Sequence, residues 1–241
     1  MIAEQAKRIA SLTIKTTADG SPTLFVPELN EHYHSVHGAL QESKHVFIEA
    51  GLRPFLQRGI PEIQVLEVGF GTGLNAILTL AEAEKTGANI HFQTIEAYPL
   101  PAGITDALNL NSVLQNELPA SNFALLHSIN WEEKTGITPH FSITKQHCPL
   151  QEANLPAAAY HVIYFDAFAP EKQPELWQED IFKKLYLCLQ PGGAFVTYCA
   201  KGTVKRQLRA VGFLVESLPG PPGKREMIRA SRTTGTTRKP V

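Results

Sequence analysis

A glycine-rich turn between a predicted strand and a predicted helix constrains the fold more than any other feature of this sequence. The apolar run at 63–68 reads as a buried strand and leads into Gly69-Phe70-Gly71-Thr72-Gly73, and a helical pattern follows from Asn75. Alternate glycines let the backbone turn tightly and let a ligand approach the main chain. The turn therefore predicts a ligand site at the carboxyl end of a strand, the alternative being a turn that holds no ligand.

Strands and helices alternate along most of the chain, which predicts a parallel, doubly wound α/β sheet. The last two predicted strands, 213–216 and 226–230, are joined by a loop rich in proline and glycine, so they should form an antiparallel hairpin at the sheet edge. This combination is the seven-stranded, Rossmann-like sheet of class I methyltransferases. The other predicted strands are 63–68, 90–95, 141–144, 161–165 and 194–198, and the predicted helices cover about 75–80, 179–189, where Pro191-Gly192-Gly193 stops the helix, and 203–211.

The N-terminal part predicts a short β extension. Segments 13–16 and 23–26 flank Asp19-Gly20, a hairpin signal, and a helix is expected from about Gly38 to Ala50. We therefore divide the chain into an N-terminal extension of short strands plus a helix, a methyltransferase domain and a disordered tail. These three parts cover residues 1–52, 53–231 and 232–241.

Composition and the chain ends predict a cytoplasmic protein. No run approaches the roughly 18 apolar residues of a membrane-spanning helix, so no membrane association is expected. The first residues lack the apolar core of a secretory signal. The three cysteines are too scattered for a disulfide framework or a zinc site.

The formal net charge of −1 conceals an asymmetry between the two ends of the chain. From Lys201 onward ten basic residues face two acidic ones, which gives +8, whereas the first 200 residues carry 12 − 21 = −9. The basic segment fits either a solvated helix and tail or an electrostatic footprint for a polyanion. Charge alone does not decide between them.

Two acidic residues near the glycine turn favour a cationic nucleoside ligand. A dinucleotide site has the spacing G-x-G-x-x-G, whereas this chain has G-x-G-x-G preceded by Glu67. Glu67 would repel an anion and attract the amino group of S-adenosylmethionine. Glu96, at the end of the second predicted strand, is expected to accept the ribose hydroxyls, the alternative being an exposed glutamate. Gln146 follows the third strand, where an aspartate often contacts the adenine.

The segment after the fourth predicted strand carries the expected chemistry. Asp166-Ala167-Phe168-Ala169-Pro170 resembles the D/N-P-P-Y/F motif of amino-methylating enzymes, in which a polar group hydrogen-bonds the target nitrogen and an aromatic ring stacks on a flat base. Methyl transfer requires an aligned lone pair, a proton acceptor and exclusion of water. Asp166 and Phe168 are therefore the catalytic candidates, although Asp166 would also suit a helix cap. The histidines at 32, 34, 37 and 45 lack the spacing of a metal site, and no metal is expected.

Several further motifs join the glycine turn and the Asp166 segment. With them the sequence resembles the methyltransferase half of the bifunctional tRNA 5-methylaminomethyl-2-thiouridine biosynthesis protein family and its stand-alone relatives, over about residues 20–230. The motifs are Tyr33-His-Ser35, Leu40-Gln-Glu42, Val46-Phe47, Glu67–Asn75, Glu96–Leu100, Asp166–Pro170, Pro174–Trp177, Pro191–Gly193 and Lys224–Met227.

The resemblance implies methylation of the exocyclic amine of 5-aminomethyl-(2-thio)uridine at the wobble position of tRNA, with S-adenosyl-L-methionine as donor. It implies that an unpaired anticodon-loop base reaches aromatic side chains. Because the chain ends before a flavin-dependent oxidase half could begin, we expect methylation only. The implied cofactor residues are Glu67, Gly69, Phe70, Gly71, Thr72, Gly73, Asn75, Glu96, Gln146 and Asp166, and the substrate residues are Tyr33, Ser35, Trp177, Tyr198, Lys224 and Arg225.

Other functions compete with this interpretation. A class I methyltransferase acting on a small-molecule or protein amine would turn over without tRNA, and a non-catalytic S-adenosylmethionine-binding module would not need the Asp166 segment. A short-chain dehydrogenase would have Tyr-x-x-x-Lys, whereas Tyr198-Cys-Ala-Lys201 is one residue too short. The sequence leaves the oligomeric state and the identity of the tRNAs open.

Overall fold

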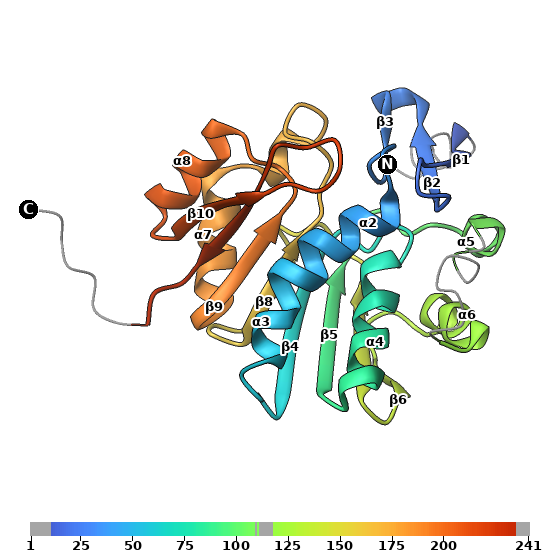
Figure 1. The fold of residues 1–241 in the computed structure, drawn as a ribbon, viewed down its shortest axis with the longest axis horizontal. Coiled ribbons are helices and arrows are strands. Elements are labelled where there is room, and N and C mark those ends of the chain that lie inside the picture. Colours follow the sequence, from blue (N-terminus) through green and yellow to red (C-terminus); the bar gives the residue numbers. More distant parts are fainter. Residues whose placement is uncertain (1–10, 109, 111–117, 235–241) are drawn as a thin grey trace, which may run out of the picture.

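The computed structural model describes residues 11–108, 110 and 118–234 and contains two β-sheets (Figure 1). The larger sheet has eight strands within these residues, in the order β10-β11-β9-β8-β4-β5-β7-β6. Its strands are β4 (Glu62–Val68), β5 (Asn89–Ile95), β6 (Lys134–Thr138), β7 (Phe141–Gln146), β8 (Tyr160–Phe165), β9 (Leu189–Thr197), β10 (Leu214–Pro219) and β11 (Glu226–Ser231).

The five inner strands, β9 to β7 in that order, run parallel, and β10, β11 and β6 are antiparallel to their neighbours. Successive side chains of a strand point to opposite faces, and the central strands β4 and β8 bury apolar side chains on both, because helices cover both faces of a parallel sheet. On β8, for example, Tyr164 belongs to one core cluster and Phe165 to the other. The helices are α4 (Leu74–Thr86), α5 (Ala102–Leu108), α6 (Ala120–Ser128), α7 (Glu179–Cys188) and α8 (Gly202–Ala210), with a 3-10 turn η4 (Pro174–Leu176).

The predicted class I methyltransferase fold is confirmed, with two differences in detail. The sheet has eight strands and not seven, because β6 pairs with β7 at the edge. Pro191-Gly192-Gly193 does not follow the helix as a turn, since α7 ends at Cys188 and β9 begins at Leu189. Arg232 exchanges backbone hydrogen bonds with Gly192 and Gly193, so this first residue of the predicted tail is held on the sheet. Residues 235–241 of that tail lie outside the described part of the chain.

The N-terminal extension forms the smaller sheet and docks on a long helix. Its strands are β1 (Thr13–Thr16), β2 (Pro22–Val26) and β3 (Glu31–His32), with a 3-10 turn η1 (Pro27–Leu29), and the predicted hairpin around Asp19-Gly20 is confirmed. Asp19 accepts hydrogen bonds from the Ser21 and Gln41 amides, both 3.0 Å, which ties the hairpin to the start of the helix.

This long helix comprises α2 (Ala39–Ser43), the π-helical η2 (Lys44–Leu52) and α3 (Arg53–Leu56), so the domain division at residue 52 falls inside one continuous helix. It runs diagonally across the sheet in Figure 1 and packs on β8, β9 and α4. Gly51 sets how close the helix comes. A Cβ at this position would lie 3.0 Å from Val196 Cγ2 and 3.2 Å from Tyr164 Cε1. None of the described helices is both long and apolar enough to pass through a bilayer.

Gly51→Ala should therefore destabilise the protein by about 1–3 kcal/mol, because overpacking forces the helix away from the sheet. The matched control is Gly103→Ala in α5, where a Cβ meets nothing within 4 Å. That change should be neutral or stabilising by up to about 1 kcal/mol, since alanine is the better helix former. Urea unfolding of both variants measures the difference, and equal stabilities would contradict this account of the packing.

Candidate active site

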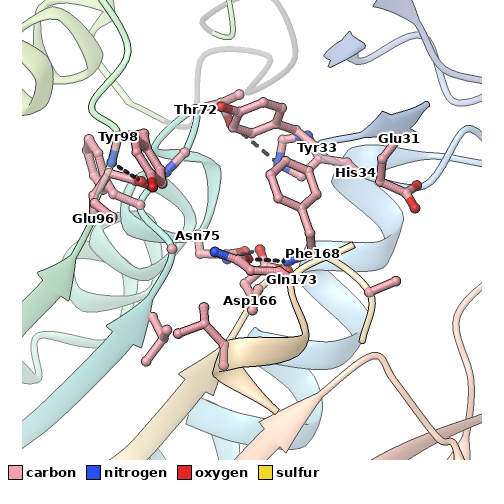
Figure 2. Close-up of a pocket in the computed structure, with 18 of the residues that line it drawn as sticks. Glu31, Tyr33, His34, Thr72, Asn75, Glu96, Tyr98, Asp166, Phe168 and Gln173 are labelled. Atoms are coloured by element: carbon pink, nitrogen blue, oxygen red, sulfur yellow. Dashed lines mark hydrogen bonds between the residues drawn. The ribbon is translucent and has the colours of Figure 1, made fainter. Parts of the chain in front are cut away.

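A cavity of about 480 Å³ opens at the carboxyl ends of β4, β5 and β8 (Figure 2). This is the edge of an open α/β sheet at which ligands bind. The loops after these strands form one wall, and the segment from β3 to α2 forms the opposite one. The lining residues fall in 31–36, 42, 68–75, 95–98, 148–151, 166–169, 173–176, 198 and 224.

The glycine turn brings the ends of β4 and β8 together. Gly69 has φ +93°, and a Cβ there would lie 2.9 Å from the Asp166 carbonyl oxygen. Gly71 has φ +51°, and a Cβ there would lie 3.1 Å from the Tyr33 ring. Any other residue would be strained at both positions, and its Cβ would crowd a neighbour. The glycines therefore set the close contacts around the cavity as well as the shape of the turn.

Glu96 closes the turn from the β5 side. Its Oε2 accepts a hydrogen bond of 3.0 Å from the Gly71 amide, and its Oε1 accepts one of 2.8 Å from the Tyr98 amide (Figure 2). Two backbone donors hold this carboxylate in place at the cavity wall, and its remaining lone pairs can accept hydroxyl protons. This is the geometry expected for a residue that takes the hydroxyls of a ribose.

Asp166 lies at the floor of the cavity and shares a hydrogen bond with Asn75. Asn75 Nδ2 donates to Asp166 Oδ2 over 2.9 Å, and the two side chains come from α4 and the end of β8 (Figure 2). Burial raises the pKa of Asp166 to about 7, and the charge of Glu42 raises it further, against the hydrogen bond from Asn75 and the charge of Lys224. A carboxyl group with a pKa near neutrality can both accept and release a proton at physiological pH.

Two aromatic rings stand beside Asp166. The rings of Tyr33 and Phe168 meet edge to face with centroids 5.2 Å apart (Figure 2). The Phe168 backbone is fixed on both sides, since its amide donates to Gln173 Oε1 over 3.2 Å and its carbonyl accepts from Trp177 Nε1 over 2.8 Å. Trp177 is itself buried against Phe165 and does not line the cavity. Trp177 thus supports the loop from behind, and its contact with the substrate stays a prediction.

Lys224 lies in the cavity wall, and its direct neighbours are Glu42 and Tyr198. The Lys224 ammonium forms an ion pair with Glu42 and lies 3.8 Å from the centroid of the Tyr198 ring. Glu42 also accepts a hydrogen bond of 2.8 Å from the Ser35 amide, and Tyr198 Oη donates to the Ala167 carbonyl over 2.9 Å. These contacts join the extension, the β10–β11 loop and the Asp166 segment on one side of the cavity.

Most predicted site residues line the cavity, but Glu67, Gly73, Gln146, Trp177 and Arg225 do not. The Glu67 side chain is completely buried below the turn, and the Gln146 side chain is engaged by the Gln93 amide at 2.8 Å. Arg225 points into solvent, with 94% of its side chain exposed. Neither side chain lines the cavity in this arrangement, in which residues 148–151 form the wall beyond β7, and their direct contacts with a cofactor stay a prediction.

His34 is a lining residue that the sequence did not single out. Its ring nitrogens lie 3.1 Å from Thr23 Oγ1 and 3.3 Å from Thr72 Oγ1, so it connects the extension to the glycine turn. Burial lowers the pKa of His34 to about 4, and the ring is neutral at physiological pH. Its position between Tyr33 and Ser35, two predicted substrate residues, was the available signal.

Within the described residues no group of three metal-ligating side chains is suited to hold a metal ion.

Comparison with known proteins relates the chain to methyltransferases. Residues 119–233 match the family described as S-adenosyl-L-methionine-dependent methyltransferase. The chain is 31% identical, over 87% of its length, to 32% of the tRNA 5-methylaminomethyl-2-thiouridine biosynthesis bifunctional protein MnmC of Cupriavidus metallidurans. It is also 31% identical, over 92% of its length, to 35% of the protein of the same name in Burkholderia mallei. The chain thus spans about a third of the length of these curated relatives.

One solved structure resembles the whole chain. The crystal structure of MNMC2 from Aquifex aeolicus superposes with a TM-score of 0.71 at 24% sequence identity, covering 96% of this chain and 73% of that one. At this identity the likeness supports the fold alone. It includes both the methyltransferase sheet and the region of the N-terminal extension, because nearly the entire chain is covered.

The raised pKa of Asp166 predicts how stability depends on pH when no ligand is present. Between pH 3.8, the ordinary pKa of an aspartate, and about pH 7, Asp166 holds a proton in the folded protein that it has released in the unfolded chain. The stabilisation of the folded protein by this proton is therefore complete below pH 4 and is lost as the pH rises through 7. Asp166→Asn removes the titration. The wild-type free energy of unfolding should therefore fall relative to the variant from pH 5 to pH 8, by up to about 2–3 kcal/mol.

Urea unfolding at the two pH values measures this difference. The control is Asp106→Asn in α5, which replaces an exposed carboxylate and should follow the wild-type pH dependence. Parallel stability curves for the wild type and the Asp166 variant would show that Asp166 titrates normally in the folded protein.

Proposed function

Since the chain is an S-adenosyl-L-methionine-dependent methyltransferase domain homologous to that of the tRNA 5-methylaminomethyl-2-thiouridine biosynthesis proteins, we propose that it methylates the aminomethyl nitrogen of 5-aminomethyl-(2-thio)uridine at the tRNA wobble position. The observation that carries the proposal is a partly buried carboxyl group of near-neutral pKa, Asp166, in the cavity that the glycine turn and the Tyr33–Phe168 ring pair also line.

The charges around the cavity suit two cations. A methyl donor of the sulfonium type and an alkylammonium acceptor are both positively charged, and a cavity lined by one sign of charge concentrates ligands of the opposite sign. Lys224 is the one lysine or arginine among the described lining residues, and it is already paired with Glu42. The carboxyl groups in the described wall are Glu31, Glu42, Glu96, Asp166 and Glu175.

The glycine turn and Glu96 fit the cofactor. The absence of a side chain at Gly71 leaves room beside the main chain, and Glu96 is fixed by two amides at the end of β5. S-adenosylmethionine, when bound there, supplies an electrophilic methyl group next to the floor of the cavity. Gly69, Phe70, Gly71, Thr72, Asn75 and Glu96 would hold it.

Asp166 would prepare the acceptor amine. A primary alkylammonium has no lone pair, so it must lose a proton before it can attack the methyl carbon. The Asp166 carboxylate can accept that proton, and the hydrogen bond from the Asn75 amide to Oδ2 orients the carboxyl group for this task. Tyr33 and Phe168 would then hold a flat base and keep water from the amine, because an unpaired base can splay out of an anticodon loop onto aromatic rings.

Fewer basic residues are free for RNA than the sequence charge suggests. Lys201 pairs with Glu171, Lys205 with Glu226 and Arg229 with Glu216. Arg232 donates to the carbonyls of residues 186, 187 and 189 at the end of α7. The tRNA backbone would instead meet Arg206 and Arg209 on the exposed side of α8 and Arg225 in the β10–β11 loop, whose side chain is 94% exposed although its Nε lies 3.9 Å from Glu226 Oε1.

Because several basic side chains are paired with acidic ones within the protein, a second candidate function is methylation of a small-molecule or protein amine, which needs no RNA-binding surface. The deciding experiment is nucleoside mass analysis of tRNA that lacks the methyl group, before and after incubation with the protein and S-adenosylmethionine. A mass gain of one methyl group on the wobble nucleoside supports the tRNA substrate, which also fits the expected cytoplasmic location. Turnover of free amines without any modification of tRNA supports the second candidate.

Asp166→Ala should lower the methylation rate by about 10²–10⁴, the usual contribution of a positioned acid or base, and leave the affinity for S-adenosylmethionine largely unchanged. In the wild type the rate should rise with pH through an apparent pKa near 7, since the carboxylate is the active form. Rate measurements across pH, with cofactor binding by calorimetry, test both statements. Full activity of the variant would remove Asp166 from the mechanism.

Replacing Arg206, Arg209 and Arg225 together by glutamine should weaken tRNA binding. The slope of log K against log salt concentration should fall by about one for each phosphate that the variant no longer neutralises. The matched control is Arg229→Gln, which removes a cation whose Nε lies 2.9 Å from Glu216 Oε2 and should change the slope little. Filter binding at several salt concentrations gives the slopes. A triple variant with the wild-type slope would exclude this surface as the RNA-binding face.

A further inference from the structure

Two buried oxygen atoms next to Asp166 lack a hydrogen-bond partner. They are Glu67 Oε1 and Asn75 Oδ1, two of the three unpartnered buried polar side-chain atoms in the described part of the chain. A buried polar atom without a partner costs about 1–3 kcal/mol, so two neighbouring cases call for a common cause.

The other atoms of these side chains are well bound. Thr94 Oγ1 donates to Glu67 Oε2 over 2.6 Å, and Asn75 Nδ2 donates to Asp166 Oδ2 over 2.9 Å. The Asn75 side chain also lies within hydrogen-bonding reach of the Glu67 carboxyl group. Glu67, Asn75 and Asp166 therefore form a chain that leads from the interior of the sheet to the floor of the cavity.

We propose that Glu67 is a neutral carboxylic acid that donates its proton from Oε1 to Asn75 Oδ1, and that it positions Asn75, and through Asn75 the catalytic carboxylate, without touching the cofactor. The role of Asp166 in this statement rests on the proposed function; the protonation of Glu67 does not.

The surroundings of Glu67 favour the neutral form. Its side chain has no exposed area, and the charged or titratable groups nearest to it are Asp166 after β8, Glu96 after β5 and the Tyr164 hydroxyl on β8. None of them is a cation. Burial raises the pKa of Glu67 well above its ordinary range, and the charges of Asp166 and Glu96 add to this, against the hydrogen-bonding contributions of Thr94 and Asn75. As a carboxylate, Glu67 would leave both its Oε1 and Asn75 Oδ1 buried without a donor.

The proton on Glu67 also decides which way the Asn75 amide faces. With its oxygen held by Glu67, the amide presents its NH₂ group to Asp166 and stabilises the charged form of that carboxyl group. If this hold were absent, the amide could turn and present its oxygen to Asp166, which would favour the protonated acid. Glu67 is thus a positioning residue for the proton acceptor.

The variants Glu67→Gln and Glu67→Leu test the proposal. Glutamine can accept the Thr94 hydrogen bond and donate its NH₂ group to Asn75, so Glu67→Gln should keep the affinity for S-adenosylmethionine and the pH–rate profile. Leucine can do neither. In Glu67→Leu the methylation rate should fall about tenfold or more, and the acid limb of the pH–rate profile should move to higher pH. A tenfold change in rate corresponds to about 1.4 kcal/mol, the size of one hydrogen bond.

Glu96→Gln is the matched control, because the same substitution at a carboxylate in the cavity wall should weaken cofactor binding measured by calorimetry. If Glu67→Gln weakens binding as much as Glu96→Gln does, Glu67 acts as a charged cofactor ligand and the proposal is wrong. Retained binding in Glu67→Gln with weakened binding in Glu96→Gln supports it.

Infrared difference spectroscopy of wild type minus Glu67→Gln gives a readout that needs no substrate. A neutral acid gives the carbonyl stretch of a protonated carboxyl group, which shifts in D₂O, and its absence near neutral pH would overturn the proposal even if Glu67→Leu fails to fold. These measurements are separate from tRNA methylation. A protein with protonated Glu67 that leaves tRNA unmodified would refute the proposed substrate and leave the protonation of Glu67 standing.

Discussion

The close approach of β4 to the end of β8 is the constraint on which the rest of the site depends. The Gly69 amide donates to Ile95 O on β5 over 2.9 Å, and the Asp166 amide donates to Val68 O over 3.0 Å. A side chain at Gly69 would crowd the Asp166 carbonyl and separate these ends. This approach places the first turn of α4 beside Asp166, so that the Asn75 amide reaches its carboxyl group. The absence of a side chain at Gly69 thus allows the glycine turn, the proposed cofactor site, to lie against Asp166, the proposed catalytic group.

The second physical theme is the charge of the cavity. Its wall holds several carboxyl groups and a lysine already paired with Glu42, and the sheet below adds Glu67 with no counter-cation. Burying like charges is costly, and proteins respond by keeping some of these groups protonated. The raised pKa values of Asp166 and Glu67 are two cases of this response. A cationic donor and a cationic amine would both relieve the repulsion, which makes the cavity selective for positive charge.

The sequence predicted what depends on local pattern. The order of strands and helices, the hairpin at Asp19-Gly20 and the glycine turn follow from periodicity and turn chemistry, and the structure has them. Prediction failed where a residue's role depends on distant neighbours. Lys224 was counted with the basic C-terminal segment and expected at the substrate, but its ion pair with Glu42, 182 residues away, could not be predicted from the sequence. Glu67 adjoins the turn in sequence, yet strand alternation turns its side chain to the interior, where Thr94 binds it.

The part of the cavity proposed to meet the acceptor is assembled from distant segments, so the Asp166 motif supplies only one piece of it. Tyr33 comes from the extension, Phe168 from the loop after β8 and Lys224 from the β10–β11 hairpin. The extension is held to the methyltransferase sheet by His34 on Thr72 and by Asp19 on the start of α2. Movement of the extension would therefore displace the Tyr33 ring from both Gly71 and Phe168. Sheet and turn can serve any class I methyltransferase, whereas under the proposed function the choice of acceptor would depend on how these segments dock.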